Sequence, residues 1–371
     1  MAPTQTALYE ELADDGLQLS WSEAELPERE RTKHVHRLHP YLGKFVPQLV
    51  EALLGRYVRP GGRVLDPFAG SGTTLVQALE SGHDAFGIDV AGFNCLLMRV
   101  KTSRYDLFAL EKELRDAVSR RGVSEERPLG YLAEWYAPRA AGELLHFRST
   151  IDDYAHADVL RVVLARAARS ARLTTHFDLE FPRVPQRQPY WCHKHRRTCR
   201  PVAEADKFLR RYLLDALDRL KAFQRVRHRK RTAEVVHGDG RNVELDVRFA
   251  GVLTSPPYPG LIDYHEQHRY AYELLGLDDR RDRELGAAAR GTSRAAIQDY
   301  VAGISDILRR CAETLEPGAP VIVVVNDRRD LYPEILELSG LRLVERLERH
   351  VNRRTGRRAG EYFESVLIAR K

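Results

Sequence analysis

Cysteines and long apolar segments are scarce in this chain of 371 residues. Four cysteines in a chain of this length do not make a disulfide framework, which agrees with a reducing compartment. No apolar run approaches the ~20 residues that a membrane-spanning helix needs. The first twenty residues are acidic and polar rather than signal-like. We therefore expect a soluble, cytoplasmic protein with no membrane partner.

Positive charge is modest in total but unevenly distributed. The formal net charge is +6, and the basic residues gather between about residues 183 and 231. Lysine and arginine that neutralise phosphates supply most sequence-independent affinity for nucleic acid. A solvated helix face with an exposed linker is the alternative explanation. The candidate DNA-binding residues are Arg196, Arg197, Arg225, Arg227, Arg229, Lys230 and Arg231.

The order of the predicted elements is that of an α/β protein. Strands are predicted at residues 63–65, 84–89, 233–239, 251–254 and 321–325, and a helix at 73–81 follows the first strand. Residues 342–347 and 362–368 read as a closing antiparallel pair. The β-loop-α-β order with glycines at the turn is typical of a doubly wound, Rossmann-like sheet.

A largely helical, basic segment interrupts this pattern. Residues 101–231 are mainly helical and polar, and we interpret them as an insertion between the second and third strands of the core. The predicted organisation is a leader at 1–33, a core domain at 34–100 and 232–371, and the insertion at 101–231.

Three predicted strands end in an acid, namely Asp66, Asp89 and Asp239. Asp66 opens a loop that contains Gly70 and Gly72, and glycines there let the backbone approach a ligand closely. The loop lacks the Gly-Lys-Ser/Thr ending of a phosphate-binding loop, and an acid would repel phosphate. A nucleoside with a cationic end fits this pattern better. Turn or N-cap aspartates are the structural alternative.

The sequence TSPPY at residues 254–258 follows the apolar segment at 249–253. The two prolines hold φ near one value and donate no hydrogen bond, so the neighbouring carbonyls stay fixed. Ser255 Oγ and the Pro256 carbonyl can accept both N–H bonds of an exocyclic amine while Tyr258 stacks on its ring. A strand-terminating turn is the alternative, and the glycine loop upstream makes that alternative weaker.

The loop DPFAGSGTT at residues 66–74 and the TSPPY sequence together resemble the two signature motifs of the amino-methylating DNA methyltransferases. The Ser-Pro-Pro-Tyr form looks most like the cytosine-N4 branch. Residues 39–47 resemble the family's N-terminal cofactor-contacting segment. The order of the motifs, with a large insertion before Asp239, departs from the family's usual arrangements. Assigning the insertion to target recognition therefore depends on its position and charge.

The resemblance implies S-adenosyl-L-methionine as the cofactor, double-stranded DNA as a partner and a cognate restriction endonuclease as a candidate partner. It leaves the oligomeric state open. The implied catalytic residues are Ser255, Pro256, Pro257 and Tyr258. The implied cofactor-binding residues are His39, Tyr41, Lys44, Asp66, Pro67, Phe68, Ala69, Gly70, Ser71, Gly72, Thr73, Asp89 and Asp239.

The predicted reaction is methyl transfer to the N4 amine of a flipped-out cytosine. Serine at 255, where adenine enzymes more usually carry aspartate, favours cytosine over adenine N6, the nearest alternative. An RNA base methyltransferase and a non-catalytic nucleic-acid-binding protein on the same scaffold are further alternatives. Cytosine C5 methylation needs a cysteine on a proline-rich loop, and none of the four cysteines follows a proline.

The segment at residues 192–199 contains Cys192, His193, His195 and Cys199. These are zinc-ligand types, but their spacing is cramped for four ligands and the surrounding arginines repel a cation. The sequence therefore predicts a basic segment facing nucleic acid here, and no metal site.

Overall fold

The structure is a computed structural model, which describes residues 17–176, 178, 182–351 and 362–371. Half of the predicted leader, residues 1–16, lies outside the described residues. Among the residues that are described, no helix has the length and apolar character needed to cross a bilayer.

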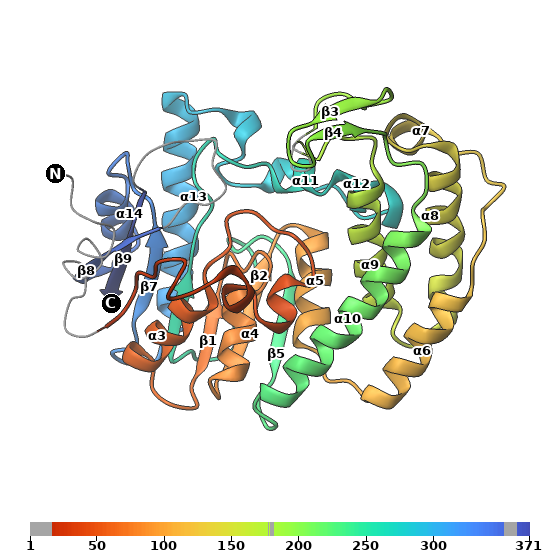
Figure 1. The fold of residues 1–371 in the computed structure, drawn as a ribbon. Coiled ribbons are helices and arrows are strands. Elements are labelled where there is room, and N and C mark those ends of the chain that lie inside the picture. The colour runs from red at the N-terminus through yellow and green to blue at the C-terminus, as the bar shows by residue number, and fades with distance from the viewer. Residues whose placement is uncertain (1–16, 177, 179–181, 352–361) are drawn as a thin grey trace.

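A seven-stranded sheet forms the centre of the molecule (Figure 1). Its spatial order is β5 (Ala233–His237), β2 (Asp84–Asp89), β1 (Arg63–Asp66), β6 (Gly251–Thr254), β7 (Val321–Val325), β9 (Phe363–Arg370) and β8 (Arg342–His350). The first five strands are parallel, and β9 runs antiparallel to both β7 and β8. The predicted doubly wound sheet with an antiparallel final pair is confirmed. The third predicted strand is shorter than expected, because it ends at His237 rather than at Asp239.

Alternating side chains of β7 face two separate cores. Val321 and Val323 pack with α13 (Arg294–Glu313) and α14 (Tyr332–Leu338) on one side of the sheet. Ile322 and Val324 pack with α3 (Pro47–Tyr57) and α4 (Thr73–Glu80) on the other. Because successive residues of a strand point to opposite faces, an all-apolar strand must be covered on both sides.

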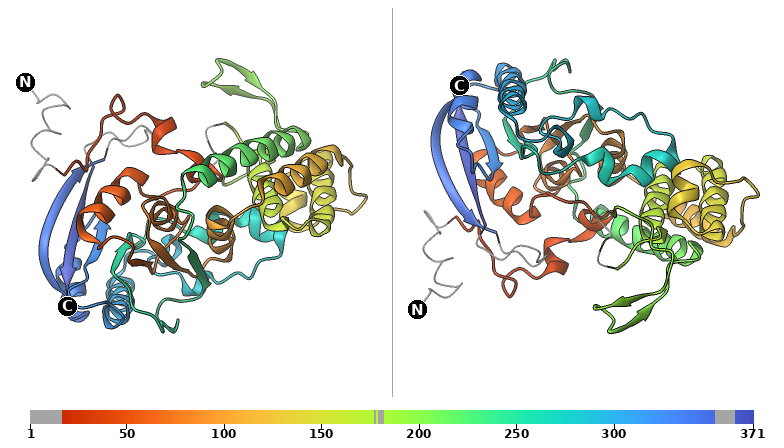
Figure 2. Two further views of the ribbon diagram at one scale, coloured as in Figure 1. Left: turned by 90° about the horizontal axis from the view of Figure 1, so that it is seen from below. Right: turned by 90° about the horizontal axis from the view of Figure 1, so that it is seen from above.

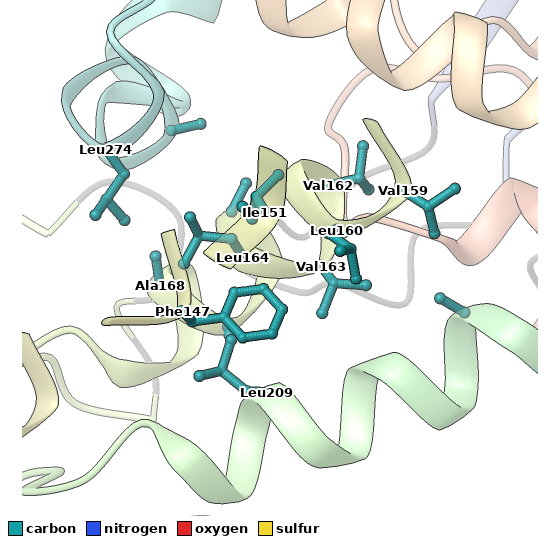
Figure 3. Close-up of a cluster of buried hydrophobic side chains, with 14 of the residues drawn as sticks. Phe147, Ile151, Val159, Leu160, Val162, Val163, Leu164, Ala168, Leu209 and Leu274 are labelled. Carbon is teal, nitrogen blue, oxygen red and sulfur yellow. The ribbon is translucent and has the colours of Figure 1, made fainter. Parts of the chain in front are cut away.

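The insertion between β2 and β5 packs beyond the β5 side of the sheet (Figure 1). After α5 (Gly92–Thr102) it contains α6 (Leu107–Ser119), α7 (Gly130–Trp135), α8 (Pro138–Thr150), α9 (Ala157–Ala171) and α10 (Asp206–Val226). Phe147, Leu164 and Leu209 belong to a third core, which these helices share with Leu274 of α12 (Arg269–Leu275) (Figure 3).

Two short strands, β3 (Tyr190–Cys192) and β4 (Arg197–Cys199), form an antiparallel hairpin within the insertion. The hairpin projects away from the helices in both views of Figure 2. The remaining short elements are α2 (Glu28–Arg31), η1 (His34–Arg37), η2 (Ile151–Asp153), α11 (Tyr264–Gln267), η3 (Arg281–Arg283) and η4 (Ala288–Arg290).

The five parallel strands give the sheet two unlike ends. At the carboxyl end, the chain leaves β1, β2, β5 and β6 in the loops that begin at residues 67, 90, 238 and 255. At the amino end, residues 227–232 lead into β5 and residues 58–62 into β1. The chain winds outward from β1 to β2 and β5, then returns to β6 beside β1. Ligands of open α/β sheets bind at the carboxyl end, where the winding reverses.

Candidate active site

A cavity that opens to solvent lies at the carboxyl end of the sheet, with about 840 Å³ of empty space when the open mouth is included. Its walls come from the loops after β1, β2, β5 and β6, and from residues 41–45. The predicted cofactor and catalytic residues that line it are Tyr41, Lys44, Asp66, Pro67, Phe68, Ala69, Gly70, Ser71, Thr73, Asp89, Asp239, Ser255 and Pro257. The cavity therefore brings together most residues that the two sequence motifs single out.

Four predicted residues do not line the cavity. His39 is fully buried and contacts Tyr270 Oη through Nε2, at 3.2 Å. Gly72 stands at the start of α4, where an added Cβ would lie 2.7 Å from Met98 Cγ. Pro256 is buried. Tyr258 is partly buried, and its hydroxyl donates to Glu364 Oε1 at 3.2 Å.

The loop after β1 follows a path that requires glycine at residue 70. Gly70 has φ +50°, and a Cβ there would lie 2.8 Å from the hydroxyl oxygen of Tyr41. The fully buried Lys101 donates from Nζ to the Ser71 carbonyl at 2.6 Å. A buried amine on a backbone carbonyl fixes this loop against α5.

Asp66 is held at the end of β1 by donors on both sides. Its Oδ1 accepts from the Phe68 N–H at 3.1 Å and from Thr254 Oγ1 at 2.6 Å. Burial raises the pKa of Asp66 to about 6, although these hydrogen bonds oppose the shift. Thr254 directly precedes Ser255, so one hydrogen bond ties the cofactor loop to the catalytic loop.

Asp89 ends β2 and organises the neighbouring loops. Its Oδ2 accepts from the Gly70 N–H at 2.8 Å, and its Oδ1 accepts from the Ala91 N–H at 2.8 Å and from Asn94 Nδ2 at 3.1 Å. Burial also raises the pKa of Asp89 to about 6. Two carboxyl groups with raised pKa values thus line one cavity, and among the described residues no cationic side chain is bonded to either.

Asp239 differs from the other two acids. It lies two residues beyond β5, and both of its carboxylate oxygens accept from the Arg241 guanidinium at 2.5–3.1 Å. Burial would raise the pKa of Asp239, but the bonds from Arg241 outweigh it and lower the pKa. Asp239, one of the three acids predicted to bind the cofactor, is therefore already engaged by an arginine.

Several residues outside the predicted cofactor set also line the cavity, and three of them make specific contacts within it. Tyr264 stacks on Tyr41 with ring centroids 5.5 Å apart. Asn94 donates to the Tyr41 hydroxyl at 3.2 Å. Glu284 accepts from the backbone N–H groups of Tyr264 and His265. Asn94 lies on α5, five residues after Asp89, and this short spacing could have identified it from the sequence. Nothing in the sequence around Glu284 identifies that residue.

Buried polar atoms of the cavity residues indicate a polar ligand. Ser71 Oγ and Asn94 Oδ1 have no hydrogen-bond partner among the described residues. Such atoms are rare in native proteins and normally find a partner in water or a ligand. With two buried carboxyl groups beside them, the donor and acceptor set fits an S-adenosyl-L-methionine molecule, which carries an amino group, hydroxyls and a positive charge.

The predicted DNA-binding residues fall into two separate places. Arg196 and Arg197 are exposed in the β3–β4 hairpin, on the same side of the molecule as the carboxyl ends of the strands (Figure 1). Residues 225–231 lead into β5, so they lie at the amino end of the sheet, opposite the cavity. The candidate DNA-binding residues therefore do not form one continuous basic surface, because strand direction separates the two groups.

Two residues of this charge run serve the fold. Arg227 is buried and donates to the carbonyls of Thr102, Ser103 and Arg231. Arg231 pairs with Asp84 at 3.1 Å. Arg225, Arg229 and Lys230 are exposed.

The sequence is similar to DNA-modifying enzymes. A DNA methylase family model (N6_N4_Mtase) matches residues 6–96. The Type II methyltransferase M.MjaII of Methanocaldococcus jannaschii is 35% identical over 95% of this chain and 83% of its own length. The Type II methyltransferase M.BsoBI of Geobacillus stearothermophilus is 22% identical over 70% of this chain and 56% of its own length.

Solved structures are more distant. TrmN from Thermus thermophilus is 14% identical, with a TM-score of 0.37, and the match covers 89% of this chain and 50% of that one. The glycopeptide N-methyltransferase MtfA, complexed with S-adenosyl-L-methionine, is 11% identical, with a TM-score of 0.30, over 88% of this chain and 87% of that one.

Proposed function

We propose that this chain, which belongs to the amino-methylating (N6/N4) DNA methylase family, transfers a methyl group to the N4 amine of cytosine in DNA. It is a Type II DNA methyltransferase that depends on S-adenosyl-L-methionine. The observation that carries the proposal is the position of Ser255, which lines the same cavity as Asp66 and Asp89 and directly follows Thr254, the residue bonded to Asp66.

The cofactor would be held by the residues of the glycine loop and by the two buried acids. Asp66 and Asp89 present carboxylates, Ser71 and Asn94 present unpartnered polar atoms, and Tyr41 adds an aromatic wall. Bound there, S-adenosyl-L-methionine supplies an electrophilic methyl group on a positively charged sulfur. The low exposure of Asp66, 2%, strengthens its attraction for a positive charge.

The catalytic loop prepares the amine of the target base. An exocyclic amine is a poor nucleophile because its lone pair is delocalised into the ring. Acceptors at Ser255 Oγ and at the Pro256 carbonyl favour a more tetrahedral nitrogen and direct its lone pair toward the cavity. Positioning and electrostatics supply most of the acceleration, and the nitrogen sheds its proton after transfer without a strong base.

Cytosine is favoured over adenine because residue 255 is a serine. A neutral hydroxyl can accept from the cytosine amine, as the Ser-Pro-Pro-Tyr form of the cytosine-N4 branch does. The partly buried Tyr258 borders the loop and offers the ring on which an extruded base would stack. Extrusion costs a few kcal/mol, and stacking offsets part of that cost.

DNA would approach the carboxyl end of the sheet, with residues 101–231 acting as the target-recognition region. The exposed Arg196 and Arg197 of the hairpin are the candidate phosphate contacts on that side. The amino-acid sequence leads us to expect a cytoplasmic location. Cellular DNA as the substrate fits that location, and so does a restriction endonuclease that recognises the same DNA site.

Product analysis tests the proposal. DNA is incubated with the protein and S-adenosyl-L-methionine, digested to nucleosides and analysed by mass spectrometry. We expect N4-methylcytosine with the wild type and a strongly reduced yield with Ser255→Ala. N6-methyladenine would reassign the target to adenine, and the absence of both products on DNA containing many different sequences would overturn the proposal.

A further inference from the structure

We infer that His176, Cys192, His195 and Cys199 form a structural zinc site that holds the β3–β4 hairpin onto the helical insertion. One nitrogen or sulfur atom from each of the four residues lies within 4.8 Å of all the others. None of the four residues lines the cavity of the proposed active site, and the inference goes beyond the methyltransferase function.

The hairpin register places both cysteines on one face. Tyr190 pairs with Cys199 and Cys192 pairs with Arg197, so the side chains of all four residues point to the same side. Arg196 occupies the left-handed region at φ +49°, which is uncommon for a residue other than glycine. This turn carries His195 back to lie between the two cysteines.

The distances between the candidate ligands match the edges of a zinc tetrahedron. Zn–S bonds of about 2.3 Å and Zn–N bonds of about 2.0–2.1 Å place tetrahedral ligand atoms about 3.4–3.8 Å apart. Cys192 Sγ lies 3.4 Å from His176 Nδ1 and 3.6 Å from His195 Nδ1. His195 Nδ1 lies 3.4 Å from Cys199 Sγ. Three of the six edges thus have the expected length.

The donor set suits a closed, structural site. Two cysteines and two histidines are a frequent tetrahedral set for zinc, and both cysteines are buried. Binding displaces the two thiol protons, and the two thiolates then neutralise the double charge of the ion. The neighbouring Lys194 and Arg197 therefore surround a site with no net charge, so their repulsion of a cation is largely cancelled.

The hairpin has little else to stabilise it. In residues 190–200 only Cys192 and Cys199 are buried, and Trp191 is 57% exposed. A two-stranded hairpin of this size is marginal in water, and small units without a core commonly depend on a metal or a disulfide. Among the described residues, the Tyr190 hydroxyl competes for one ligand atom: it lies 2.9 Å from His176 Nδ1 and would have to give up that nitrogen to the metal.

The sequence pattern concealed this site. Residues 192–199 offer His193 as the apparent fourth ligand, and the resulting spacing is too cramped for a tetrahedron. The structure leaves His193 exposed and outside the cluster, and it brings in His176 from sixteen residues before Cys192.

Metal analysis of the full-length protein tests the inference. After incubation with zinc and exhaustive dialysis, we expect about one zinc per chain by mass spectrometry of the metal. Cys192→Ser, Cys199→Ser and His176→Ala should each lose most of it. His193→Ala, in the same turn, and Cys311→Ser, a buried cysteine of α13, should keep it.

A second measurement covers variants that do not fold. The wild-type protein reconstituted with Co²⁺ should show the intense visible absorption of a tetrahedral cobalt–thiolate centre, and a chelator should make two further thiols reactive. A wild type that retains no zinc, or a zinc content that falls only in His193→Ala, would overturn the inference. Either result leaves the methyltransferase proposal untouched, because none of these residues lines the cavity.

Discussion

Strand β2 begins and ends with an aspartate, and the two residues have opposite environments. Asp84, at the amino end, bonds to the Thr232 N–H and pairs with Arg231. Burial would raise its pKa, but these contacts outweigh burial and lower it. Asp89, at the carboxyl end, has no basic side chain bonded to it in the part of the chain that the structure describes, and burial raises its pKa to about 6.

The difference separates structural charges from functional ones. At the amino end of β2, Asp84 and Arg231 neutralise each other, so neither charge is left for a ligand. At the carboxyl end, two acids are buried beside a cavity at an energetic cost, which a cationic ligand would remove. The two ends of β2 are distinguished more by whether the aspartate has an opposite charge beside it than by the number of charges at each end.

The largest effect is expected from replacing the aspartates of β2 with alanine, one at a time. Asp89→Ala should weaken S-adenosyl-L-methionine binding at least ~30-fold, the equivalent of about 2 kcal/mol for charge-assisted hydrogen bonds. Asp66→Ala should behave similarly. Asp84→Ala should bind the cofactor as the wild type does. Calorimetric titration measures all three, and equal losses in Asp84→Ala and Asp89→Ala would remove the distinction between the two ends.

Two hydroxyl groups, one at each end of the parallel strands, provide the next test. Ser255→Ala should lower kcat at least ~10-fold with little change in cofactor affinity, because it removes an acceptor used in the transition state. Thr232→Ala removes a hydroxyl that donates to Asp84 at 3.2 Å and should leave kcat unchanged. Single-turnover methylation gives the rate for each variant. A Ser255→Ala rate near that of the wild type would contradict the assigned role.

The pH dependence of cofactor binding follows from the raised pKa values. In the free protein, Asp66 and Asp89 take up protons as the pH falls through about 6. A bound cation stabilises the ionised forms and lowers both pKa values, so binding near pH 6 should release protons and weaken severalfold toward pH 5. Calorimetry in buffers of different ionisation enthalpy counts the protons. Proton uptake on binding would contradict the assignment.

The smallest effect concerns DNA. Arg196→Ala with Arg197→Ala should reduce the slope of log affinity against log salt by up to about 2, since each lost phosphate contact contributes about 0.9. Arg229→Ala with Lys230→Ala removes two equally exposed charges at the amino end and should leave the slope unchanged. Fluorescence anisotropy at several salt concentrations measures both. The reverse result would place the DNA on the opposite side of the sheet.

Local patterns predicted the sheet well. Val321–Val325 and the strands ending near Asp66 and Asp89 are short, apolar and bounded by turns, so their identity depends on few neighbours. The same reasoning placed the glycine loop and Ser255 at one cavity. The predicted parallel order also fixes the direction of each strand. Because Arg225 comes shortly before β5, that direction should have placed it at the amino end of the sheet, away from Arg196.

Other features depend on contacts that no local pattern encodes. Glu284 reaches the cavity through a loop, and His176 joins the cysteine cluster from a segment sixteen residues before Cys192. In each case the partner is selected by tertiary packing rather than by spacing along the chain.

The hydrogen bond from Thr254 to Asp66 joins two adjacent parallel strands, β6 and β1. Neighbouring strands are separated by about 4.8 Å, a distance fixed by backbone geometry and shared by all sheets. In the proposed site, the ladder itself would thus set the gap between the methyl-donor side and the base side of the reaction. Closing of a lid or rotation of a domain can admit the two substrates, but it has no need to adjust the distance between them.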